Sequence, residues 1–70
     1  MRYAIYFFGG WNSAPTFEKA LEFARILVRN HYEKTESLGE SFAIIYDKLN
    51  YSRWILFKVS KGETRYKQVY

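Results

Sequence analysis

The sequence predicts a single α+β domain with the element order β-α-β-β-β, in which one helix packs on one face of a small, mainly antiparallel sheet. Three observations predict it. The chain has only 70 residues, one stretch repeats apolar residues at helical spacing, and four stretches rich in aromatic and β-branched residues are bounded by turn-forming residues. A chain of this length is too short to divide, so residues 1–70 are expected to form one domain.

The first strand is predicted over residues 2–8, which are apolar on both faces and end at Gly9 and Gly10. A strand of that kind is usually covered on both sides. A strand followed by glycines and a helix start is also the layout of a phosphate-binding loop. Since no Lys or Arg lies between Phe8 and Glu18 and no phosphate-loop spacing is present, we interpret the glycines as a structural turn, with a small-anion site as the alternative.

The helix is predicted over residues 16–35. Apolar residues recur there at the 3.6-residue period, and charged residues form the opposite, solvated stripe. Thr16 or Ser13 can cap the start, and Glu18 suits the positive end of the helix dipole. The side chains expected against the sheet are Phe17, Leu21, Ala24 and Val28.

The remaining strands are predicted over residues 41–46, 51–59 and 64–69, with a four-residue loop at 47–50 that pairs Phe42 with Ile55. In the last hairpin, a two-residue loop at 61–62 sets Phe57 opposite Tyr66 and Lys58 opposite Arg65. The alternative register sets Phe57 opposite Arg65. It would direct two cations into the expected core, so the hydrophobic pattern favours the first register.

This register predicts which face the helix covers. The covered face is expected to hold Phe42, Ile44, Tyr46, Ile55, Phe57, Val59 and Tyr66. The other face is expected to hold Ala43, Ile45, Trp54, Leu56 and Val69, together with residues of the first strand. No second helix exists to cover it, and an exposed apolar face of this size is typical of an interface.

Charge is concentrated near the C-terminal end. Residues 48–70 hold six cations and one anion, for a net charge of +5, whereas residues 1–47 hold five cations and six anions. Lys58 and Arg65 are expected to face one another on the uncovered side, where an anionic partner would relieve their repulsion. Alternatively, both side chains extend into water and need no partner. The predicted binding residues are Ile45, Trp54, Leu56, Lys58, Arg65, Lys67 and Val69.

The catalytic inventory is small. The chain has one histidine, His31, and no cysteine, so neither a Ser-His-Asp set nor a metal site follows from spacing. His31 is interpreted as a packed residue at the edge of the core, and Glu18 and Glu22 as solvated charges. We therefore expect no enzyme, no cofactor and no metal. The apolar stretches are too short to span a membrane, and the expected compartment is the cytoplasm.

These features favour a non-catalytic protein-binding module that forms a homodimer through the uncovered face and acts stoichiometrically, as an inhibitor or adaptor. In its size, its lack of cysteine and its aromatic density, the chain resembles the small accessory proteins that phages encode to block host systems, although no motif carries that resemblance. The alternative is a nucleic-acid-binding protein that uses the basic, aromatic C-terminal hairpin, with Trp54 and tyrosines stacking on bases.

Overall fold

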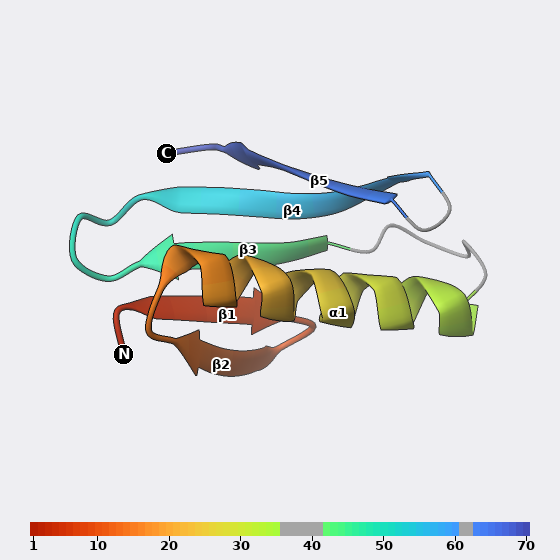
Figure 1. Cartoon of the computed structure of the whole chain (residues 1–70), viewed down its shortest axis with the longest axis horizontal. Helices are drawn as coiled ribbons and strands as arrows, with labels where there is room; N and C mark the ends of the chain where they lie inside the picture. Colours follow the sequence, from red (N-terminus) through yellow and green to blue (C-terminus); the bar gives the residue numbers. More distant parts are fainter. Residues whose placement is uncertain (36–41, 61–62) are drawn as a thin grey trace.

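The computed structural model confirms one helix packed against an antiparallel sheet (Figure 1). It describes residues 1–35, 42–60 and 63–70, and for 32–35 and 58–60 it describes the backbone alone. The elements are β1 (Tyr3–Phe7), β2 (Gly10–Ala14), α1 (Phe17–Thr35), β3 (Phe42–Asp47), β4 (Arg53–Ser60) and β5 (Glu63–Gln68). The five strands lie in the order β2-β1-β3-β4-β5, and every neighbouring pair is antiparallel.

Strand β2 was not predicted from the sequence. It pairs with β1 through a tight hairpin in which Phe7 lies opposite Gly10, so the turn consists of Phe8 and Gly9. Both turn residues have positive φ, 45° for Phe8 and 79° for Gly9. Positive φ at both central positions is what a type I′ hairpin turn requires, and glycine adopts it without strain. Gly9 therefore reverses the chain and Gly10 begins β2, so the glycines do not lead directly into the helix.

Helix α1 follows the predicted boundaries within one residue. Thr16 is its N-cap, because its side-chain oxygen accepts the backbone N–H of Lys19 at 3.2 Å and its carbonyl accepts that of Ala20 at 3.0 Å. The residues facing the sheet recur at helical spacing. Ala20, Ala24 and Val28 are fully buried and Phe17, Leu21 and Leu27 pack against them.

The helix lies along β1 and β3 (Figure 1) and covers one face of the sheet, which we call the helix-covered face. Its buried apolar sheet residues are Tyr3, Ile5, Ala14, Ala43, Ile45 and Leu56. An aromatic cluster closes the core near the start of the helix. The Phe17 ring lies 4.7 Å from that of Trp54 and 5.7 Å from that of Tyr66, and Tyr3 contacts both Phe17 and Trp54.

The predicted assignment of the two faces is inverted for β3 and β4, whereas Tyr66 on β5 lies on the helix-covered face as predicted. Ile45 and Leu56 are fully buried beneath the helix, whereas the set expected in the core (such as Phe42, Ile44 and Phe57) alternates with them and points the other way. The physical reason is how closely the helix can approach the sheet. The helix presents the small side chains of Ala20 and Ala24 to the sheet, and a close approach suits the small Ala43 rather than a row of rings.

The loop between β3 and β4 also differs from the prediction, since it begins one residue later. Asp47 stays in β3, and its carboxylate accepts the backbone N–H of Leu49 at 2.9 Å, while Tyr51 takes a φ of 65°. Phe42 therefore lies opposite Phe57, two residues from the predicted Ile55. A shift of two residues leaves every side chain on its original face.

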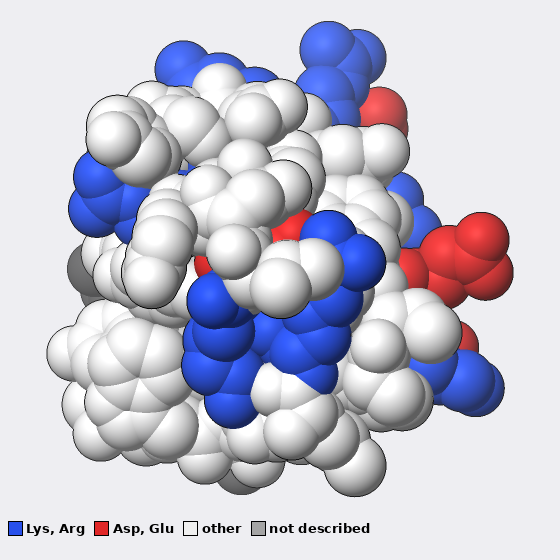
Figure 2. Space-filling model, turned by 90° about the vertical axis from the view of Figure 1, so that its left-hand side faces the viewer, with Lys and Arg blue, Asp and Glu red and all other residues white. Residues whose placement is uncertain are grey.

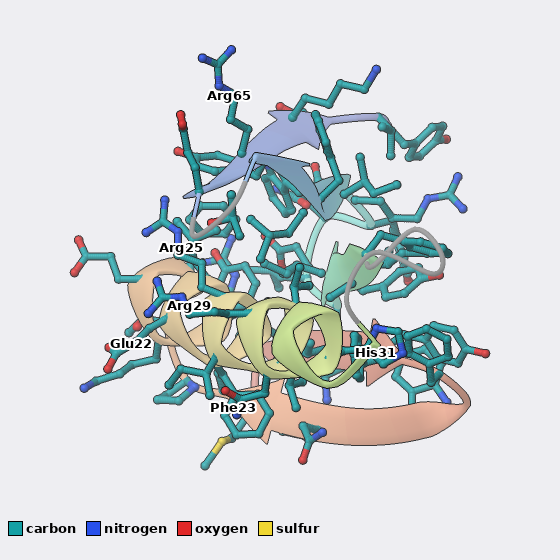
Figure 3. All side chains as sticks on the ribbon, turned by 90° about the vertical axis from the view of Figure 1, so that its right-hand side faces the viewer. Glu22, Phe23, Arg25, Arg29, His31 and Arg65 are labelled. Carbon is teal, nitrogen blue, oxygen red and sulfur yellow. The ribbon has the colours of Figure 1, made fainter. Side chains whose placement is uncertain are left out.

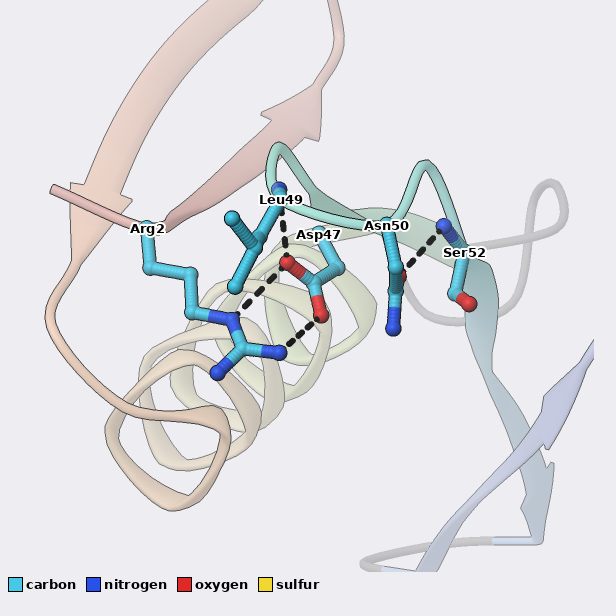
Figure 4. Close-up of polar contacts among 5 residues, drawn as sticks. All are labelled: Arg2, Asp47, Leu49, Asn50 and Ser52. Atoms are coloured by element: carbon cyan, nitrogen blue, oxygen red, sulfur yellow. Dashed lines mark hydrogen bonds and ion pairs between the residues drawn. The ribbon is translucent and has the colours of Figure 1, made fainter.

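Asp47 is 2% exposed, and Arg2 neutralises it (Figure 4). The Arg2 guanidinium donates two hydrogen bonds, from Nε to Oδ1 at 2.9 Å and from Nη2 to Oδ2 at 2.8 Å. These bonds hold the pKa of the Asp47 carboxyl below its ordinary value, against the opposing effect of burial, and they raise the pKa of Arg2. The pair ties the residue before β1 to the end of β3.

The last hairpin begins in the predicted register and then leaves it. Ser60 lies opposite Glu63, as a two-residue loop requires, but the register shifts between Lys58 and Ser60. Beyond that bulge, Phe57 faces Arg65 and Lys58 faces Thr64, so the predicted pairing of Lys58 with Arg65 is wrong. Beyond the bulge the hairpin adopts the alternative register, which the hydrophobic pattern did not favour. Its cations do not enter the core, because Phe57 lies on the face away from the helix.

Candidate functional site on the open sheet face

The sheet face turned away from the helix is the candidate site, and we call it the open face. Strand register and alternation assign it Ala4, Tyr6, Trp11, Ser13, Phe42, Ile44, Tyr46, Arg53, Ile55, Phe57, Glu63, Arg65 and Lys67. Within the described residues, no helix or strand covers these side chains. The open face is therefore a continuous surface that is largely apolar from β2 to β4 and charged on β5.

One half of the open face is aromatic. Trp11 on β2 is 60% exposed, and its ring lies 5.0 Å from that of Tyr6 and 5.5 Å from that of Tyr46. Tyr6 and Tyr46 are half-buried, on β1 and β3. Tilted rings at these separations attract one another. The aromatic half consequently presents a preformed surface of three neighbouring rings.

The other half, on β4 and β5, carries cations. Arg53, Arg65 and Lys67 are exposed, and Glu63 is the acidic residue of the open face as defined above. The Arg53 guanidinium lies 4.9 Å from the centre of the Tyr70 ring. Arg65 makes a 3.8 Å ion pair with Glu63, in which both side chains are well exposed to solvent. A pair of that kind contributes little to stability, so the charge remains available to a partner.

The predicted binding residues are divided by the structure. Ile45 and Leu56 are fully buried, and Trp54 is half-buried in the aromatic cluster beneath the helix, so none of the three can serve as an exposed anchor. Arg65 and Lys67 lie on the open face as predicted. The remaining predicted residues are Val69, which is exposed just after β5, and Lys58, whose side chain lies outside the described residues.

Sequence reasoning missed the aromatic half of the site. Trp11 belongs to a strand that was not predicted, and Tyr46 was assigned to the core. A signal was present in the chain, because Gly9 preceded by an aromatic run and followed by Trp11 fits a two-residue hairpin turn. Pairing the two arms of that hairpin would have placed Trp11 opposite Tyr6.

Basic residues also gather at the end of the molecule that holds both chain termini (Figure 2). Arg2 and Lys48 are exposed there and close in space, since the Lys48 backbone N–H donates to the Arg2 carbonyl at 3.0 Å. Arg53 begins β4 after the adjoining loop. Asp47 is the acidic residue among them, and Arg2 already neutralises it. This end extends the positive charge of the open face around its edge.

The outer side of the helix has a different character. Glu22, Arg25 and Arg29 project from it away from the sheet (Figure 3), so opposite charges are mixed there. Beside them, between the helix and the end of β2, is an open hollow of about 360 Å³. Its lining residues are Met1, Ser13, Ala14, Pro15, Lys19, Glu22, Phe23 and Ile26.

The described part of the chain holds no group of three or more His, Asp or Glu side chains able to hold a metal ion. His31 is half-buried near the end of the helix, where its ring lies 4.3 Å from that of Phe8 and 5.8 Å from that of Phe7. It packs against the β1–β2 hairpin, as a residue at the edge of the core would. Among the described helical residues, no segment has the length and hydropathy needed to cross a membrane.

No family model matches the chain, and no curated protein or solved structure is significantly similar to it.

Proposed function

We propose that this protein is a small non-catalytic binding module that self-associates through its open face and acts stoichiometrically, as an inhibitor or adaptor of another protein. The observation that carries the proposal is the continuous apolar surface from β2 to β4. Apolar surface in that amount is costly to leave in water. A contiguous exposed patch on a small domain is typical of a protein interface.

The test compares two double variants that remove similar apolar surface from opposite sides of the molecule. Trp11→Ala with Phe57→Ala acts on the open face, whereas Phe23→Ala with Ile26→Ala acts on the outer side of the helix, where the two side chains are 39% and 49% exposed. We expect light scattering to show a dimer for the wild type and the helix variant, and a monomer for the open-face variant. Equal association of both variants would contradict the proposal.

A second candidate function is the binding of single-stranded nucleic acid. The observation that favours it is the placement of Arg53, Arg65 and Lys67 on the same face as the three aromatic rings. Proteins that bind single strands combine stacking rings with a positively charged track for the backbone. The basic end at Arg2 and Lys48 would lengthen that track.

Fluorescence polarisation with single-stranded DNA and RNA separates the two candidates. Nucleic-acid binding requires an affinity that falls steeply with salt and a salt dependence that weakens in Lys67→Ala. The protein-binding proposal requires no such titration, and its dimer should persist as salt is raised because the interface is mainly apolar. Salt-sensitive binding by a monomer would favour the second candidate.

A further inference from the structure

We propose that a second copy of this chain occupies the open face in one particular orientation, with the aromatic half of each copy on the cationic half of the other. The inference rests on the proposed self-association and specifies its geometry. It follows from the order of residues across the sheet. Two such faces can stack symmetrically in two ways, and the residues that meet are complementary in only one of them.

One cross-strand row through the middle of the open face shows the order. Its residues, from β2 to β5, are Trp11, Tyr6, Ile44, Ile55 and Lys67. An aromatic pair stands at one end, two isoleucines lie at and beside the central strand, and a cation stands at the other end. The row therefore has unlike ends and an apolar middle.

Two sheets that pack face to face keep their strands within about 30° of each other, and a homodimer relates them by a two-fold axis. If the axis runs parallel to the strands along β3, the second copy is reversed across the sheet. Lys67 of each copy then lies over Trp11 of the other, Ile55 lies over Tyr6, and Ile44 meets its own counterpart. If the axis runs across the strands, each strand stacks on itself, so Lys67 meets Lys67.

Charge decides between these axes. In the second arrangement Lys67 faces Lys67 of the other copy, and the acidic residue of the open face, Glu63, lies four residues away along β5. In the first arrangement Lys67 meets the face of the Trp11 ring, which attracts it.

Each copy also supplies Lys67 to the Trp11 ring of the other copy, a contact that a single copy cannot make. Trp11 is 60% exposed, and among the described residues its ring neighbours are Tyr6 on β1 and Tyr46 on β3, so its outer surface can receive a cation. Lys67 is exposed on β5, at the other edge of the sheet from Trp11, and it pairs with Ile55 on β4. No single copy can bring the two together, because three strands separate them.

Cysteine cross-linking tests the orientation directly, since the native chain has no cysteine. Ser13 lies on the open face of β2, and Val69 lies beside Arg53, to whose carbonyl it donates a hydrogen bond of 2.9 Å. The proposed axis brings Ser13 of one copy over Val69 of the other. A short bismaleimide should therefore link Ser13→Cys to Val69→Cys when the two variants are mixed, and it should leave Val69→Cys alone unlinked.

Lys67→Glu provides a second measurement. In the proposed orientation it sets a carboxylate over the Trp11 ring and should weaken dimerisation by about tenfold or more. In the other orientation it only exchanges one like-charge pair for another and should change little. The matched control is Lys19→Glu on the helix side, which should leave the dimer unchanged in either case.

The outcomes separate this inference from the function on which it rests. A dimeric wild type with the Ser13–Val69 link and a weakened Lys67→Glu variant supports the orientation. A dimer in which Arg65→Cys links instead to Val69→Cys, or in which Lys67→Glu associates normally, overturns the orientation and keeps self-association. A wild type that stays monomeric, whether or not it binds single-stranded DNA, overturns both.

Discussion

The two faces of the sheet are similarly apolar. The helix covers one of them, whereas among the described residues no helix or strand covers the other. The helix-covered face holds Ile5, Ile45 and Leu56, all fully buried. The open face holds residues that are at least as large and hydrophobic, among them Phe42, Ile44 and Phe57, yet these stay half-buried or exposed. Hydrophobicity alone therefore does not select the core side of this sheet.

This difference indicates that the size of the side chains beneath the helix determines which face of the sheet the helix covers. Small residues lie in the core on both elements, Ala20 and Ala24 on the helix and Ala43 on β3, and all three are fully buried. Close approach of helix and sheet increases the dispersion contacts of every larger neighbour. Among the described residues, no helix or strand of the same copy covers the bulky rings on the other side, which is why that side is the candidate interface.

The largest expected effect comes from adjacent residues on β4 that point to opposite faces. Leu56→Ala removes a fully buried side chain and should lower the free energy of unfolding by about 2–5 kcal/mol, since the cavity adds to the lost transfer energy. Ile55→Ala, on the open face, should cost much less at low protein concentration. Urea denaturation followed by circular dichroism measures both.

The difference in stability between the Leu56→Ala and Ile55→Ala variants should depend on protein concentration. If the open face is a dimer interface, the penalty of Ile55→Ala should grow as the concentration rises, because folding and association are linked. The penalty of Leu56→Ala should not depend on concentration in this way. Similar penalties for both variants at every concentration would mean that the faces are assigned wrongly.

The two tryptophans offer a second matched pair, with a somewhat smaller effect. Trp54 is half-buried among Phe17, Tyr3 and Tyr66, so Trp54→Ala should cost about 2–3 kcal/mol, less than a fully buried ring. Trp11→Ala should change the stability of the monomer by under about 1 kcal/mol, because the ring is mostly exposed. Thermal melts at dilute concentration distinguish them, and equal losses would contradict the assignment.

The inverted faces also mark how far the sequence could be interpreted. The helix followed from periodicity and its cap at Thr16, and all four predicted strands needed only small changes of boundary. The assignment of faces failed because both faces of β3 are apolar, so alternation carried no information. It then rested on the register of the last hairpin, and the bulge between Lys58 and Ser60 shifts that register by one residue.

The candidate site was only half predictable for a related reason. Arg65 and Lys67 were found by charge, which is visible in composition. The aromatic half depends on β2, whose sequence from Gly10 to Ala14 has only one strand-favouring residue, Trp11. Such a strand forms because its hairpin turn and its pairing with β1 hold it, and neither is a property of the segment itself.

The ion pair at the end of the helix-covered face predicts a pH dependence. Because the pKa of Asp47 is lower in the folded protein than its ordinary value, the pair stabilises the fold above the unfolded pKa of about 4, and this stabilisation is lost as the pH falls through the folded pKa. Asp47→Asn should lower the Tm at neutral pH and lose less further stability on acidification. Glu22→Gln, which changes an exposed carboxylate, is the control.

The smallest expected effect tests the turn that brings Trp11 to the open face. Gly9 has a φ of +79° and nothing within 4 Å of where a Cβ would stand, so any cost of Gly9→Ala comes from the backbone alone. That cost should be about 1 kcal/mol, and Gly9→Asn should recover part of it because asparagine tolerates positive φ. Gly10→Ala is the matched control, since its Cβ would make an ordinary 3.5 Å contact with the Phe7 carbonyl oxygen. Chemical denaturation of the three variants measures the difference. If Gly9→Ala is no more costly than Gly10→Ala, the turn does not depend on positive φ at Gly9, and the pairing of Trp11 with Tyr6 must be held by the strands themselves.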